Sequence, residues 1–175
     1  SRRACSAVAC DISSRSARTM VGPEAPLVGG LVDQFRHAGL TIVGPTKTAA
    51  RLEGSKSFAK EFMRKYAIPT ARYDVIPNLT KGAYQLHHWT GRSVMKADGL
   101  AAGKGVKVCK NEAEAREFLY EVMEKEAFGS AGSTMIIEEC LEGEEATILA
   151  FCDGTTLVPM PASQDHKRQK DNDEG

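Results

Sequence analysis

Several common site types are absent from this sequence. The five cysteines include no C-x-x-C pair, so the spacing of a structural zinc site is missing. No apolar run approaches the roughly 20 residues that span a bilayer. The formal net charge is zero, which argues against electrostatic binding of nucleic acid. The sequence therefore predicts a globular protein with neither a membrane partner nor a nucleic-acid partner.

The cysteines and histidines give little further indication of a functional site. Three cysteines lie in apolar, strand-like runs, where cysteine is most often a small core residue. We therefore expect a reducing compartment and no disulfides. The adjacent pair His87 and His88 could bind a metal, but without a matched partner it is more typical of a polar helix end.

Two standard phosphate-binding fingerprints are also missing. The run GLAAGKG at residues 99–105 has one residue too few before Gly-Lys for a Walker A loop, and Gly105 stands where Ser or Thr would hold magnesium. The dinucleotide pattern G-x-G-x-x-G does not occur. What is present is VMKADGLAAGKGV, residues 94–106, which predicts a strand, a small-residue loop and a return strand. Such a loop is often only a turn, but its glycines also allow backbone N–H groups to surround a phosphate.

The order of the other predicted elements indicates a βα unit followed by an α+β unit with antiparallel strands. In the helix from Ser55 to Tyr66, apolar Phe58, Phe62 and Met63 form a stripe with polar residues opposite, so we expect a surface helix. Asn111 and Glu114 predict a capped helix start, and Asp153-Gly154 predicts a hairpin turn. The other expected elements are a helix opened by Pro26 and closed by Gly39, strands at 41–43, 71–76, 134–138, 146–152 and 155–160, and helices at 46–52, 81–89 and 115–125.

Six segments in this order resemble the phosphoribosylamine–glycine ligase (glycinamide ribonucleotide synthetase) family of ATP-grasp enzymes. They are GPEAPLVGGL, IVGPTKTAARLEGSKSFAKEFM, IPTARY, VMKADGLAAGKGV, IIEECLEGEEA and SQDHKR. The resemblance runs from Val21 to the end of the chain, and the pair GLAAGKG and SQDHKR is highly specific. It implies an α/β and α+β ATP-grasp fold, preceded by the end of an N-terminal βα domain.

The resemblance also implies a domain layout. Residues 1–20 do not match and are expected to be disordered, residues 21–52 would end the N-terminal domain, and residues 53–175 would form an ATP-grasp domain truncated on its C-terminal side. Mg²⁺ (or Mn²⁺) is implied as a cofactor beside ATP, with its ligands beyond residue 175 and none within this chain. We therefore expect a fragment with little ligase activity, and turnover that requires both glycine and phosphoribosylamine would contradict this.

The resemblance implies roles for particular residues. Lys56 and Lys96 would reach the α- and β-phosphates of ATP, with Lys104 and the loop glycines over them as a mobile lid. Backbone groups of residues 138–141 would hold adenine and Glu145 would hold the ribose. The implied ATP-binding residues are Lys56, Lys96, Gly99, Gly103, Lys104, Gly105, Glu138, Glu139, Cys140, Leu141, Glu145 and Arg168. Lys96, Lys104 and Arg168 would act in catalysis, and Asp165, His166 and Lys167 would face phosphoribosylamine.

The implied reaction joins glycine to 5-phosphoribosylamine through glycyl phosphate in cytoplasmic purine biosynthesis, in some organisms as part of a multifunctional chain. Two alternatives stay open. One is a nucleotide-binding module without catalytic activity, and the other is a different ATP-grasp ligase that joins a carboxylate to an amine. From the residue types alone, a solvated strand end is the favoured interpretation of Glu138, Glu139, Glu142, Glu144 and Glu145.

Overall fold

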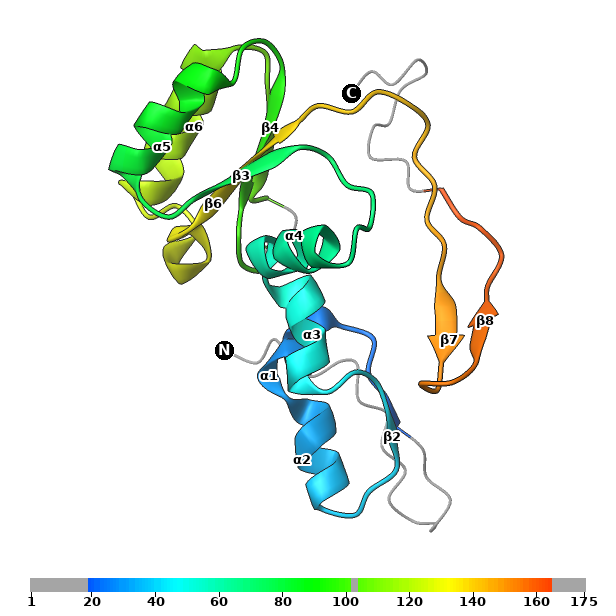
Figure 1. Ribbon diagram of the computed structural model, residues 1–175. Coiled ribbons are helices and arrows are strands. Elements are labelled where there is room, and N and C mark those ends of the chain that lie inside the picture. The colour runs from blue at the N-terminus through cyan, green and yellow to red at the C-terminus, as the bar shows by residue number, and fades with distance from the viewer. Residues whose placement is uncertain (1–18, 102–103, 165–175) are drawn as a thin grey trace. The chain divides into compact units, whose positions relative to one another are not determined.

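The computed structural model describes residues 19–101 and 104–164 of the 175-residue chain (Figure 1). The chain divides into two compact units, Ser1–Cys140 and Leu141–Gly175. Among the described residues, no helix combines the length and the apolar character needed to cross a membrane.

The first unit begins with a small βα arrangement. Strands β1 (Thr19–Met20) and β2 (Ile42–Val43) pair in parallel, and helices α1 (Glu24–Gly29) and α2 (Leu31–His37) lie between them in the chain. The single helix expected here is split, because Gly30 adopts φ +89° at the junction. Pro26 lies inside the first turn of α1 and does not open it. The expected end at Gly39 is confirmed, with φ +70° just after α2.

Strand β1 corrects part of the expectation for residues 1–20. Thr19 is buried and its N–H donates to the Thr41 carbonyl at 3.1 Å, so Thr19 and Met20 belong to the ordered βα arrangement. The first eighteen residues lie outside the described part of the chain.

Two capped helices lead from this arrangement to the sheet. Thr46 caps α3 (Lys47–Gly54) by accepting from the Ala49 N–H, and Ser55 caps α4 (Lys56–Lys65) by accepting from the Phe58 N–H. The expected surface helix forms, but the burial of one of its charged residues was not expected. Its buried residue is Lys60, whereas the apolar stripe of Phe58, Phe62 and Met63 is only half-buried.

A four-stranded antiparallel sheet forms the centre of the first unit, with strand order β3-β6-β4-β5. Its strands are β3 (Tyr73–Ile76), β4 (Ser93–Ala97), β5 (Val106–Cys109) and β6 (Met135–Glu139). The expected strand, loop and return strand of residues 94–106 is confirmed, because β4 and β5 pair directly across the glycine-rich loop. Strand β6 lies centrally, which explains its continuous apolar run.

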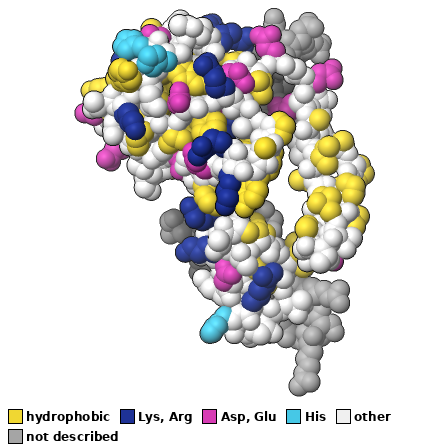
Figure 2. All heavy atoms as spheres, in the orientation of Figure 1, with side chains coloured by type: hydrophobic (Ala, Val, Ile, Leu, Met, Phe, Trp, Pro, Cys, Tyr) yellow, Lys and Arg dark blue, Asp and Glu magenta, His cyan; other side chains and the backbone are white. Residues whose placement is uncertain are grey.

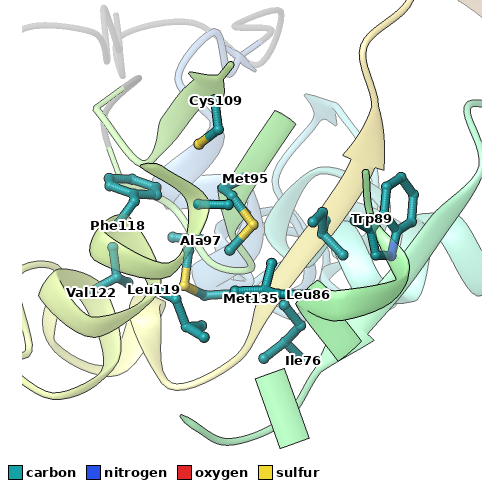
Figure 3. Close-up of a cluster of buried hydrophobic side chains, with 12 residues drawn as sticks. Ile76, Leu86, Trp89, Met95, Ala97, Cys109, Phe118, Leu119, Val122 and Met135 are labelled. Atoms are coloured by element: carbon teal, nitrogen blue, oxygen red, sulfur yellow. The ribbon is translucent and has the colours of Figure 1, made fainter. Parts of the chain in front are cut away.

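Helices α5 (Leu79–Gln85) and α6 (Glu112–Met123) cover one face of this sheet, with short 3₁₀ segments at Leu86–His88 and Gly129–Gly132 (Figure 1). The cap of α6 forms as expected, since Asn111 accepts from the Glu114 N–H. Figure 3 shows the side chains that pack between helices and sheet, among them Met95, Leu119 and Met135, all fully buried. Because β4 alternates, Met95 and Ala97 enter this core while Val94 and Lys96 face the opposite side of the sheet.

The second unit contains a hairpin of β7 (Ala150–Cys152) and β8 (Leu157–Pro159), whose antiparallel pairing confirms the expected turn. Asp153 organises that turn by accepting from the N–H groups of Thr155 and Thr156. The strands are shorter than expected, and a separate bridge joins Thr147 to Ser163.

Candidate functional site

Backbone hydrogen bonds join the base of the glycine-rich loop to two neighbouring segments of the first unit. The Ala97 N–H donates to the Gly105 carbonyl at 2.7 Å, which closes the hairpin between β4 and β5. The Asp98 N–H donates to Thr134 and the Gly99 N–H donates to Ala131, at 3.0 and 3.1 Å. The Gly99 N–H is therefore paired within the protein.

Lys56 lies at this loop base, where its expected partner was a phosphate. Its Nζ donates to the carbonyl oxygens of Ala97 at 2.9 Å and Gly99 at 3.2 Å. Partial burial lowers the pKa of Lys56 below its ordinary value; Asp98 opposes this shift and Lys96 adds to it. Ala97 follows Lys96 directly in β4, so the Lys56 ammonium contacts the backbone next to the second predicted lysine.

Asp98 joins the loop to the start of α4. Its carboxylate accepts from the Ser57 N–H at 2.6 Å and from the Ser55 hydroxyl at 3.0 Å, while its carbonyl accepts from the Lys56 N–H at 3.2 Å. A carboxylate at a helix N-terminus satisfies free N–H groups and complements the helix dipole. Asp98 thereby holds Lys56 in place beside β4.

Lys96 projects from the sheet face opposite the helical core. Its Nζ lies 2.7 Å from Oε1 of Glu138, and the other oxygen of that carboxylate lies 2.8 Å from the Nζ of Lys60. The Lys96 side chain is 28% exposed, whereas those of Lys60 and Glu138 are 8% and 7% exposed. Lys96 is thus the member of this cluster that a ligand can reach. Figure 2 shows Lys and Arg side chains gathered over the region of α3 and α4.

The other predicted site residues are distributed as follows. Lys104 is exposed and its N–H donates to Ala101, so this N–H is also paired within the loop. The Glu139 carboxylate accepts from the N–H of Arg72, the residue just before β3, at 2.9 Å. Cys140 is half-buried at the end of the first unit, and exposed Leu141 and Glu145 belong to the second. Gly103, Asp165, His166, Lys167 and Arg168 lie outside the described residues.

Sequence reasoning missed Lys60 and Asp98. Lys60 stands one helical turn after Lys56, so the period of α4 places both lysines on one side of the helix, but no neighbouring residue in the sequence indicates that Lys60 is buried. Asp98 follows β4 directly in the chain. Its carboxylate binds the N-terminus of α4, which is distant in the sequence, so the tertiary structure is needed to see this contact.

Gly99 is needed for close packing, not for an unusual backbone angle. A Cβ at this position would lie 2.9 Å from both Cα and Cβ of Ala131. We expect Gly99→Ala to lower the free energy of unfolding by about 1–3 kcal/mol, because backbone must move to admit the methyl group. Urea unfolding measures this. Gly29→Ala is the control, since nothing lies within 4 Å of its Cβ position; equal stability of the two variants would contradict the packing argument.

Comparison with known proteins identifies the family to which this chain belongs. The ATP-grasp (A) domain of phosphoribosylglycinamide synthetase matches residues 54–175, and the N domain of the same enzyme matches residues 5–53. The chain belongs to the phosphoribosylglycinamide synthetase family. The N-domain match also corrects the expectation that the resemblance begins only at Val21.

Curated members of the phosphoribosylglycinamide synthetase family are similar along most of this chain. The phosphoribosylamine–glycine ligases of Xylella fastidiosa (strain Temecula1) and Pseudomonas aeruginosa are each 51% identical over 157 residues, or 90% of the chain. The chain spans 36% and 37% of their lengths.

Solved structures with a similar fold include another ligase of this family and a more distant ATP-grasp protein. The phosphoribosylamine–glycine ligase of Thermotoga maritima is 37% identical, with a TM-score of 0.71 over 77% of this chain and 34% of that one. A biotin carboxylase domain from Hydrogenobacter thermophilus is 18% identical with a TM-score of 0.67, covering 90% of this chain and 36% of that one, a likeness of fold alone. The expected ATP-grasp fold is thereby confirmed.

Proposed function

We propose that this chain carries the ATP-binding part of a phosphoribosylamine–glycine ligase, which joins glycine to 5-phosphoribosylamine in purine biosynthesis. The observation that carries the proposal is the contact of Lys56 from α4 with the Ala97 and Gly99 carbonyls, at the base of the glycine-rich loop that follows Lys96 in the chain. Two lysines beside a loop of small residues suit a polyphosphate. The 51% identity to named ligases supports the choice of substrates.

In the proposed reaction, a carboxylate oxygen of glycine attacks the γ-phosphorus of ATP and the bond to the bridging oxygen breaks, which yields glycyl phosphate and ADP. The amine of phosphoribosylamine then attacks the acyl carbon, loses a proton and expels phosphate. Catalysis of phosphoryl transfer depends mainly on positioning and on neutralising charge. Lys96, which is half-buried on its sheet face, would contact the phosphates, and Lys104 would cover them when the loop closes.

The remaining assignments belong to the same proposal. The backbone of residues 138–141 would hold adenine, Glu145 would accept from the ribose hydroxyls, and Asp165, His166, Lys167 and Arg168 would serve the substrates and nucleotide. The described residues contain no cluster of three or more His, Cys, Asp or Glu side chains able to hold a metal. We therefore assign no ligand here for Mg²⁺ or Mn²⁺, which would neutralise phosphate charge when bound with ATP.

Calorimetric titration of the chain with ATP and Mg²⁺ tests the proposal. We expect Lys96→Met to weaken ATP binding about 10- to 100-fold, because it removes a charged hydrogen bond to phosphate while keeping the apolar stem. Lys65→Met removes the same charge from the exposed end of α4 and serves as the control. Equal affinities of the unaltered chain and Lys96→Met for ATP would refute the assigned site.

A further inference from the structure

Glu138 is a buried carboxylate shared between two lysines from different elements. Oε2 lies 2.8 Å from the Nζ of Lys60 on α4, and Oε1 lies 2.7 Å from the Nζ of Lys96 on β4. Each carboxylate oxygen therefore has its own lysine, and together the two contacts define the orientation of the carboxylate plane. The proposed contacts with adenine use only the backbone of residues 138–141. They give the Glu138 side chain no function, whereas its two lysine contacts do.

The Lys60 ammonium is enclosed by partners within the protein. Besides Glu138, its Nζ donates to the Thr70 hydroxyl at 2.7 Å and to the Ala71 carbonyl at 3.4 Å. Its side chain is 8% exposed, so Lys60 acts on its surroundings through Glu138 and not through direct contact with a nucleotide.

The strand register puts Lys96 and Glu138 on one face of the sheet. Val94 pairs with Glu138 and Lys96 pairs with Ile136, so the two charged side chains are diagonal neighbours on adjacent strands. With a single lysine, the carboxylate would neutralise Lys96 fully and hold it against the sheet. With two lysines on one carboxylate, the cluster keeps a net positive charge, and that charge lies at its exposed member.

We propose that Lys60 is a positioning residue of the nucleotide site, which holds the Glu138 carboxylate so that Lys96 is oriented and left positively charged toward phosphate. The inference rests on the proposed function, because it takes Lys96 as the phosphate-binding lysine. Residues within one salt-bridge network are energetically coupled, so a change at Lys60 reaches Lys96 without any contact between Lys60 and the nucleotide.

Comparing ATP with adenosine separates positioning from a merely structural role. We expect Lys60→Met to weaken ATP binding about tenfold, because the carboxylate then binds Lys96 alone and the cluster loses its net positive charge. Adenosine, which lacks phosphates, should bind the variant within about twofold of the unaltered chain. Lys65→Met, with the same charge change on the same helix, should leave both affinities unchanged. Equal losses for ATP and adenosine, or no loss of either, would overturn the proposal.

A second measurement needs no nucleotide. In the free chain labelled with ¹³Cε-lysine, the Lys96 resonance, assigned with Lys96→Met, should shift in Lys60→Met and stay in place in Lys65→Met. An unshifted Lys96 resonance in Lys60→Met would also overturn the proposal. If the unaltered chain binds no ATP, the proposed function fails, and this comparison alone decides whether Lys60 positions Lys96.

Glu138→Gln tests the carboxylate itself, because it keeps the side-chain volume but presents a single acceptor oxygen to the two lysines. The variant raises the positive charge of the cluster, so weaker ATP binding, which we expect to be about tenfold with adenosine within about twofold, would result from lost orientation of Lys96. Circular dichroism confirms that the variant is folded before titration. ATP affinity equal to that of the unaltered chain would show that the carboxylate does not orient Lys96.

Discussion

Glu138→Ala should lower the free energy of unfolding by about 3–5 kcal/mol, which is the usual loss when one partner of a buried ion pair is removed. Lys60 would keep its hydrogen bonds to Thr70 and Ala71 but would have no counter-charge. Its side chain is 8% exposed, so water cannot replace the carboxylate without opening α4 from the sheet. Urea unfolding followed by circular dichroism measures the loss.

Two variants show whether the buried charge is the cause. Glu139→Ala removes the neighbouring carboxylate, which accepts from the Arg72 N–H, and we expect it to lower the free energy of unfolding by about 1 kcal/mol. Adding Lys60→Met to Glu138→Ala removes the unpaired buried charge and should restore much of the lost stability. If the double variant is less stable than Glu138→Ala, lost packing and not an uncompensated charge would explain the result.

Leu119→Ala should lower the free energy of unfolding by about 3 kcal/mol, through lost burial and the cavity that remains. Leu119 is fully buried on α6, in the cluster that also contains Ile76 and Met135 (Figure 3). Helix α5 approaches it closely, since a Cβ on Gly82 would lie 2.8 Å from a Leu119 methyl group. Because both helices meet there, we also expect faster amide hydrogen exchange throughout α5 and α6.

Tyr120→Ala is the matched control, because Tyr120 follows Leu119 on the same helix and is 49% exposed. A surface substitution of this kind should change the free energy of unfolding by less than about 1 kcal/mol. Similar losses for the two variants would show that α6 does not pack on the sheet through the Leu119 face.

Much of the sheet could be predicted because its signals are local. The run 94–106 alternates around a glycine-rich turn, and the pairing of β4 with β5 confirms that pattern. Asn111 and Glu114 mark the start of α6, and the structure shows that cap. The break at Gly30 was missed because a glycine inside a helical pattern is compatible with either a continuous helix or a turn.

The burial of Lys60 was missed for a different reason. A lysine on a surface helix is normally exposed, but Lys60 is buried because Glu138, 78 residues later in the chain, supplies its counter-charge. A lysine can be buried only where such a partner exists, and the partner is not visible from the sequence around Lys60.

The amino-acid sequence by itself determined the family, the ATP-grasp fold and the two lysines beside the glycine-rich loop, because short motifs and strand periodicity are carried by neighbouring residues. Only the tertiary structure decided that Asp98 caps α4, that Lys56 contacts the carbonyls of the loop base, and that Lys60 and Lys96 share Glu138. Each of these contacts joins residues more than 40 positions apart, and the energy of a buried charge depends on which groups the fold brings next to it.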